Sequence, residues 1–174
     1  FLPFFCLFIS GAASLVYELI WIRQLALVFG STLYAISAVL CAFMMGLALG
    51  AWCIGIFLNS KSKNKEPINS IQLYGFLEGV IGLYALFFPY ALEILAEWYA
   101  PLISESLKLG TQIHWIEFGM GTALMLPATI CMGATFPLMA SWSIGKRRDR
   151  VIADVSILYS LNTFGAVTGC LYTQ

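Results

Sequence analysis

Charge is what this sequence has least of. Only 10% of its 174 residues are charged, against about 25% in an ordinary soluble domain. Nine Lys and Arg balance nine Asp and Glu, so there is no basic excess to neutralise the phosphates of a nucleic acid. The hydrophobic share is 60%, and a soluble chain this apolar and without net charge would tend to precipitate. The composition therefore argues against a nucleic-acid partner and indicates an integral membrane protein.

The sequence also lacks the groups of most catalytic and metal sites. His114 is the only histidine, and with Glu117 it makes at most half of a metal site. The five cysteines stand singly, without a C-x-x-C pair. There is no G-K-S/T phosphate loop, and no G-x-G-x-x-G follows a strand pattern. We therefore expect no catalytic residue, cofactor or metal in this segment.

Long apolar runs are what the sequence has instead. A helix needs about 20 apolar residues to cross the bilayer, and five runs meet or approach this length. We predict an all-α, polytopic helix bundle in one transmembrane domain, residues 1–174. The predicted spans are 1–22, 32–58, 71–96, 113–144 and 151–174. The fourth is too long for one straight span and carries Pro127 and Pro137, so we expect it to be kinked or broken there.

The basic residues predict the orientation. Seven of the nine Lys and Arg fall in two short loops, 59–67 and 145–150, which the positive-inside rule places in the cytoplasm together with the N-terminus. Tryptophans lie near the predicted span ends, as an aromatic belt requires, with Trp21 assigned to the outer boundary. The topology-setting cations are Lys61, Lys63, Lys65, Lys146, Arg147, Arg148 and Arg150.

Pairs of glycines four residues apart predict where helices touch. Such pairs let helix backbones approach closely in lipid. The pairs are Gly46 with Gly50, Gly75 with Gly79, and Gly165 with Gly169. We expect these helices to form a compact bundle with one another and with neighbouring helices or subunits.

A few polar side chains fall inside the spans, where they are costly unless paired or hydrated. Glu18 and Arg23 lie about 140° apart around an ideal helix, so they do not pair directly. We consider one intramembrane polar cluster that lines a cavity or proton path, against a structural role in interhelical hydrogen bonds. Its members are Tyr17, Glu18, Arg23, Glu78 and Asn162.

Four stretches of the chain resemble one family. They are SGAASLVYELIWIRQLALVFGSTLYAISAVLCAFMMGLALGAW at 10–52, LYGFLEGVIGLYALFFP at 73–89, LPATICMGATFPLMA at 126–140 and LYSLNTFGAVTGC at 158–170. In this order they resemble the N-terminal transmembrane region of membrane-integral spermidine synthase-like proteins. The resemblance marks Tyr17, Glu18, Trp21, Arg23, Glu78, Met132, Gly133, Ala134, Thr135, Phe136, Pro137, Asn162, Thr163 and Gly165.

The resemblance implies a noncatalytic membrane domain that anchors or assists a soluble aminopropyltransferase. The catalytic part of such proteins binds decarboxylated S-adenosylmethionine and a diamine, and its motifs have no counterpart here. This segment is thus no enzyme by itself, although a longer parent could be one. We expect it to be a segment of a longer chain, in contact with the lipid bilayer and with a small amine as a candidate ligand.

Two other interpretations remain open. One is an accessory or scaffold subunit of a multi-subunit membrane complex, which the apolar surface and small-residue faces suit. The other is half of a major-facilitator-like transporter with the intramembrane acids as cation sites. The loop between the second and third spans lacks the Asp and Gly-Arg pair of such transporters.

Overall fold

The chain folds into five helices, each long and apolar enough to cross a membrane. The computed structural model describes residues 2–29, 33–63, 69–109, 113–146 and 151–173. Its helices are α1 (Leu2–Phe29), α2 (Leu33–Lys63), α3 (Ser70–Leu109), α4 (Ile113–Lys146) and α5 (Val151–Tyr172). The predicted all-α bundle is confirmed, and the described residues contain no strand.

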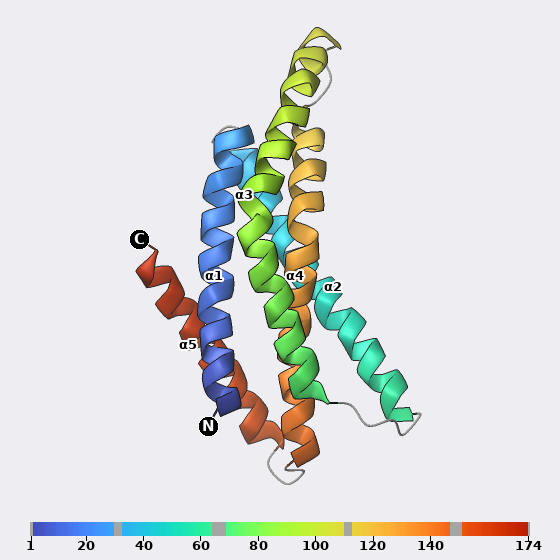
Figure 1. The fold of residues 1–174 in the computed structure, drawn as a ribbon, viewed down its shortest axis with the longest axis vertical. Coiled ribbons are helices and arrows are strands. Elements are labelled where there is room, and N and C mark those ends of the chain that lie inside the picture. Colours follow the sequence, from blue (N-terminus) through green and yellow to red (C-terminus); the bar gives the residue numbers. More distant parts are fainter. Residues whose placement is uncertain (1, 30–32, 64–68, 110–112, 147–150, 174) are drawn as a thin grey trace.

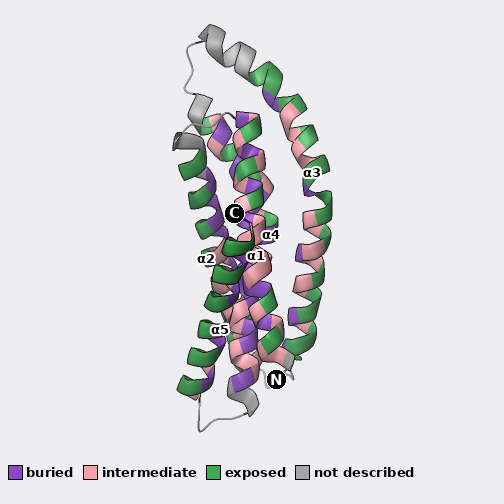
Figure 2. Cartoon of the chain, turned by 90° about the vertical axis from the view of Figure 1, so that its left-hand side faces the viewer, coloured by how far each residue is buried: buried purple, intermediate pink, exposed green. Residues whose placement is uncertain are grey.

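The helices form two close pairs, with a third helix packed on one of them. The most extensive contacts join α2 to α4 and α1 to α5, and α3 packs along α4. The contacts of α1 with α2 and of α4 with α5 are few by comparison. Half of the α4 span is buried (50%) but only 11% of the α3 span, so α4 is the central helix. Figure 2 shows α3 standing to one side of the other helices, with much of its length exposed.

The α2–α4 pair is held at backbone contact by three glycines. A Cβ atom built on Gly46 would overlap the side chain of Thr129, and one on Gly50 would overlap the Ile130 carbonyl. In return, a Cβ on Gly133 would overlap the backbone of Leu47. Without side chains at these positions the two helices approach closely, and dispersion contacts replace the missing hydrophobic drive in lipid.

The α1–α5 pair uses the same device. A Cβ on Gly165 would overlap the carbonyl of Phe8, and one on Gly169 the carbonyl of Ala12. On the α1 side, Gly11 lies against the backbone and side chain of Asn162. Of the glycine pairs predicted from sequence, those at 46/50 and 165/169 lie at helix crossings. Gly75 and Gly79 differ, because a Cβ on either would meet no heavy atom within 4 Å outside its own helix.

Helix α4 runs without interruption through both of its prolines, so the broken helix that we considered is not observed. Proline removes one backbone hydrogen bond, and membrane helices tolerate this when neighbouring groups satisfy the freed carbonyls. Pro127 leaves the Ala123 carbonyl without its helical donor, and on the next residue the Tyr84 hydroxyl of α3 donates a hydrogen bond to the Leu124 carbonyl, which ties α3 to α4 beside the proline. Thr129 donates to the Met125 carbonyl at 3.0 Å.

Helix α3 is longer than the predicted span at 71–96. It continues through Pro89 and Pro101 for 40 residues, or about 60 Å. This exceeds the roughly 30 Å of hydrocarbon, and its C-terminal end rises beyond the other helices in Figure 1. Hydropathy identifies only the part of a helix that lies in lipid. A helix can continue beyond that part, because polar residues such as Glu93 and Glu97 are good helix formers. Residues 97–109, which the predicted spans leave outside the membrane helices, are therefore helical.

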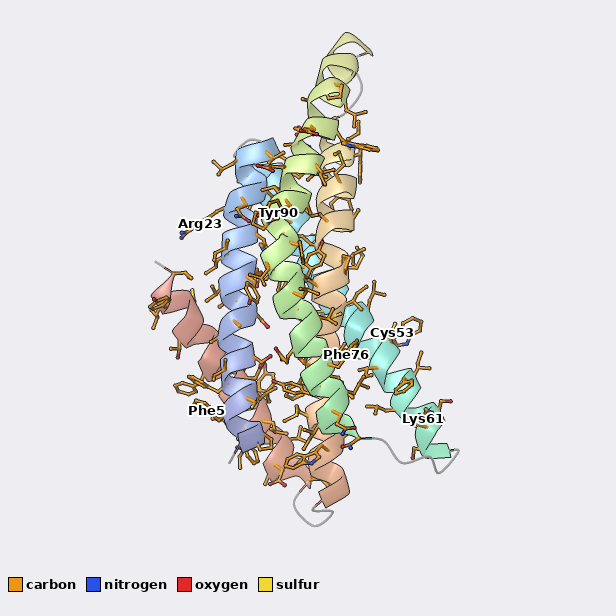
Figure 3. All side chains as sticks on the ribbon, viewed as in Figure 1. Phe5, Arg23, Cys53, Lys61, Phe76 and Tyr90 are labelled. Carbon is orange, nitrogen blue, oxygen red and sulfur yellow. The ribbon has the colours of Figure 1, made fainter. Side chains whose placement is uncertain are left out.

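The larger buried core cluster is rich in aromatic side chains and takes residues from α1, α2, α3 and α4. Trp21 is only 2% exposed and stacks on Phe88 with ring centroids 4.6 Å apart. The aromatic-belt pattern implied a Trp21 ring that faces the lipid interface, but the ring turns inward. By contrast Phe5, Phe76 and Tyr90 point outward from the bundle, as lipid-facing residues do (Figure 3).

The α2–α4 crossing can be tested with a single methyl group. Gly50→Ala should lower the free energy of unfolding by about 1–3 kcal/mol, because the methyl group overlaps the Ile130 carbonyl. Thermal unfolding of the purified protein in mild detergent measures this. Gly79→Ala is the matched control, and it should change stability by no more than about 0.5 kcal/mol. Equal losses in the two variants would contradict the crossing.

Candidate functional site

A cavity of about 400 Å³ lies between the two close helix pairs. It is open on one side, and α1, α2, α4 and α5 all contribute to its lining. Helix α3 contributes no residue to it. The lining consists of Gly11, Ser14, Leu15, Glu18, Phe43, Met44, Leu47, Ala51, Met132, Gly133, Thr135, Phe136, Pro137, Asn162 and Ala166.

Glu18 is the only ionisable side chain among these residues. It is 6% exposed, and within the described part of the chain no hydrogen-bond donor or cation contacts its carboxyl group. Burying a carboxyl group at membrane depth costs several kcal/mol unless it finds a partner or water. A group kept in this position is a functional-site candidate by default.

Three uncharged polar residues share the cavity with Glu18. Asn162 lies across the α1–α5 crossing, with its side-chain oxygen against Gly11. The Thr135 hydroxyl donates to the Met132 carbonyl of its own helix at 2.7 Å, so its proton is already engaged. Ser14 lies one helical turn from Glu18 on α1. The remaining lining is apolar or glycine.

The predicted polar cluster is therefore divided. Of its five members, Glu18 and Asn162 lie at one cavity. Tyr17 belongs to the aromatic core, where its ring stacks on Trp21 with centroids 5.6 Å apart. Glu78 accepts a hydrogen bond from Ser10 at 2.5 Å and is not part of the cavity lining.

Arg23 lies toward the C-terminal end of α1, and its side chain contacts the chain just beyond the end of α5. Its guanidinium donates to the carbonyl of Thr173, just beyond the end of α5, at 3.3 Å. The last carbonyls of a helix have no partners within the helix, and a cation there also interacts favourably with the helix dipole. Figure 3 shows Arg23 reaching outward from α1 on the side of the C-terminal end of α5.

The other two buried acids each have a hydroxyl partner. Glu117 on α4 accepts a hydrogen bond from Tyr99 of α3 at 2.6 Å, and both residues are buried. Asp154 at the start of α5 accepts one from Ser143 of α4 at 3.1 Å. These pairs join neighbouring helices, which is the structural role that we considered for intramembrane acids.

No metal site forms among the described residues, where no three His, Cys, Asp or Glu side chains gather. The side chain of His114 lies outside them. All five cysteines are free thiols. Of the topology-setting cations, Lys61 lies at the end of α2, with its ammonium 5.9 Å from the Phe57 ring centroid. The others, or their side chains, lie outside the described residues: Lys63, Lys65, Lys146, Arg147, Arg148 and Arg150.

Sequence reasoning missed the contribution of α2 to the cavity. Phe43, Met44, Leu47 and Ala51 line it, and their pattern does not differ from that of lipid-facing residues. It also missed Gly11, which has no partner glycine four residues away on α1. Only the packing of α1 on α5 gives Gly11 its role.

Fold and cavity together define a polytopic helical membrane protein whose described helices border a cavity with a single carboxyl group in its lining. No protein-family model, no curated protein and no solved structure matches this chain.

The structural role of Glu117 gives a test. Tyr99→Phe removes a buried donor to this carboxyl group, and should lower the free energy of unfolding by about 1 kcal/mol. Thermal unfolding in detergent measures the loss. Tyr90→Phe makes the same chemical change at an exposed position of α3 and should have no effect. Equal stability of the two variants would contradict the hydrogen bond's role.

Proposed function

We propose that this chain is the noncatalytic membrane domain of a spermidine synthase-like protein. It anchors a soluble aminopropyltransferase part at the membrane and holds a small amine at the Glu18 cavity. The proposal begins with the resemblance of four stretches of the sequence, and the placement of the first, third and fourth of them around one cavity supports it.

The main support for the proposal is that distant parts of the sequence meet at one cavity. Glu18 comes from the first resembling stretch, Met132–Pro137 from the third and Asn162 from the fourth. These segments are far apart in the sequence, yet residues of all three line one cavity. If the three stretches form one ligand site, this would explain why all three resemble the same family.

We assign the domain a binding and anchoring role because its cavity has too few reactive groups for aminopropyl transfer. Aminopropyl transfer needs a site for a nucleoside-bearing donor and a group that deprotonates the attacking amine. The cavity offers one carboxyl group in an apolar lining, with no glycine-rich nucleotide loop near it in the sequence. The transfer reaction accordingly belongs to a part of the parent protein outside these residues.

The orientation that we propose has the N-terminus and the two basic loops in the cytoplasm. The start of α1, the end of α2, the start of α3, the end of α4 and the start of α5 all lie at one end of the bundle (Figure 1). Both basic loops connect helix ends of this group, as one cytoplasmic face requires. The soluble enzyme part would find its diamine on that face.

Cysteine labelling in cells tests the orientation. Asn64→Cys, in the first basic loop, should react with a membrane-impermeant maleimide only after permeabilisation. Lys108→Cys, near the far end of α3, should react in intact cells. The native protein is the background control, since its cysteines lie inside the candidate spans and react slowly with a charged reagent. The reverse pattern would overturn the orientation.

The anchoring role is tested on the full-length gene product. Aminopropyl transfer from decarboxylated S-adenosylmethionine to a diamine should be found in the membrane fraction. Glu18→Gln should leave kcat in detergent within about twofold, since a residue outside the reacting atoms leaves the barrier unchanged. A gene product without this activity, or loss of kcat in Glu18→Gln, would overturn the proposal.

A further inference from the structure

Glu18 differs from the other buried and half-buried acids of the described helices. Glu78, Glu117 and Asp154 each accept a hydrogen bond from a hydroxyl group on a neighbouring helix. Glu18 is as well buried as Glu117, at 6% exposed, but it faces a cavity and no donor among the described side chains reaches it. A buried carboxylate of this kind needs a donor or a positive charge. The donor must then come from what fills the cavity.

The cavity lining determines the rest of the ligand. None of the lining residues is Lys, Arg or His, so no cation among the described side chains competes for Glu18. The other polar groups, on Ser14, Thr135 and Asn162, are uncharged. Most of the wall is formed by apolar side chains such as Phe43, Leu47 and Phe136. A ligand that matches this wall carries one positive charge at one end and an apolar body behind it.

We propose that the Glu18 cavity binds a primary monoammonium ion with an apolar chain, in preference to a diamine or polyamine. This rests on the proposed function only in taking the Glu18 cavity as the ligand site, and it names the ligand class. The ammonium forms a charge-assisted hydrogen bond with the Glu18 carboxylate. The apolar chain lies along the aliphatic and aromatic wall and is removed from water there.

A diamine fits less well because the cavity offers one anion. A second ammonium at the far end of the ligand would meet hydroxyl and amide groups and apolar surface, with no second carboxylate among the lining residues. A buried charge without a counter-charge is unfavourable even when neutral dipoles solvate part of it. The aminopropyl acceptor of the soluble part is a diamine, so the cavity would hold a different amine from the one that the reaction consumes.

Binding of three matched ligands to the purified full chain in lipid nanodiscs tests this. The ligands are hexylammonium, 1,6-hexanediammonium and 1-hexanol, and equilibrium dialysis against protein-free nanodiscs removes the contribution of lipid partitioning. Hexylammonium should bind at least tenfold more tightly than either of the others. Saturable binding of the diammonium with equal or higher affinity would overturn the monocation assignment. Equal binding of 1-hexanol would overturn the role of charge.

Variants then assign the binding to Glu18. Glu18→Gln should weaken hexylammonium binding at least tenfold and leave 1-hexanol binding unchanged, whereas Glu18→Asp should retain most of the affinity for hexylammonium. Glu93→Gln makes the same charge change on an exposed residue of α3 and should have no effect. Unchanged hexylammonium binding in Glu18→Gln would overturn the proposal. If Glu18→Gln does not fold, judged by its elution profile and melting temperature, the three-ligand comparison on the native chain decides.

The two proposals can fail separately. A gene product without aminopropyltransferase activity that still binds hexylammonium through Glu18 would remove the proposed function and leave the ligand class standing. Membrane-bound transferase activity with no saturable hexylammonium binding would do the opposite.

Discussion

Backbone-to-backbone contact between helices is the constraint on which this structure depends. In lipid, helices gain little from burying apolar side chains, so their association relies on close packing. Here α2 meets α4, and α1 meets α5, at glycines whose missing side chains leave room for the partner's carbonyl groups. The crossing point of each pair is thereby set mainly by backbone atoms, which cannot move aside as a side chain can by changing rotamer. Rigid pairs of this kind hold side chains between them in defined places.

The cavity follows from how the two pairs meet. Contacts between the pairs are few compared with those within them, and the space left over is the one that Glu18 and Asn162 face. Two residues connect the rigid crossings directly to the cavity, since Gly11 and Gly133 belong both to a crossing and to the lining. A larger residue at either position would both push the helices of a pair apart and fill part of the cavity. The packing that stabilises the bundle thus also shapes its candidate site.

The sequence predicted the parts of this structure that depend on local composition and on the spacing of residues along a helix. Long apolar runs predict five helices, and glycines four residues apart predict two crossings, because both signals are local. Which helix meets which is not local, and neither the α1–α5 partnership nor the inward turn of Trp21 follows from hydropathy. The candidate site shows the same limit. Polarity selects Glu18 and Asn162, which line the cavity, but it also selects Tyr17, Arg23 and Glu78, which do not. A sequence does not show on which side of a helix the partner will lie.

The buried acids of this bundle differ in whether a neighbouring helix supplies them with a hydrogen-bond donor. Glu117 and Asp154 have hydroxyl partners on adjacent helices, so their cost in lipid is offset within the protein. Arg23 has the free carbonyl of Thr173. Glu18 has neither, and a carboxyl group that faces a dry, mostly apolar cavity is unfavourable. The ligand proposed for the cavity would supply the partner that the described side chains do not give to Glu18.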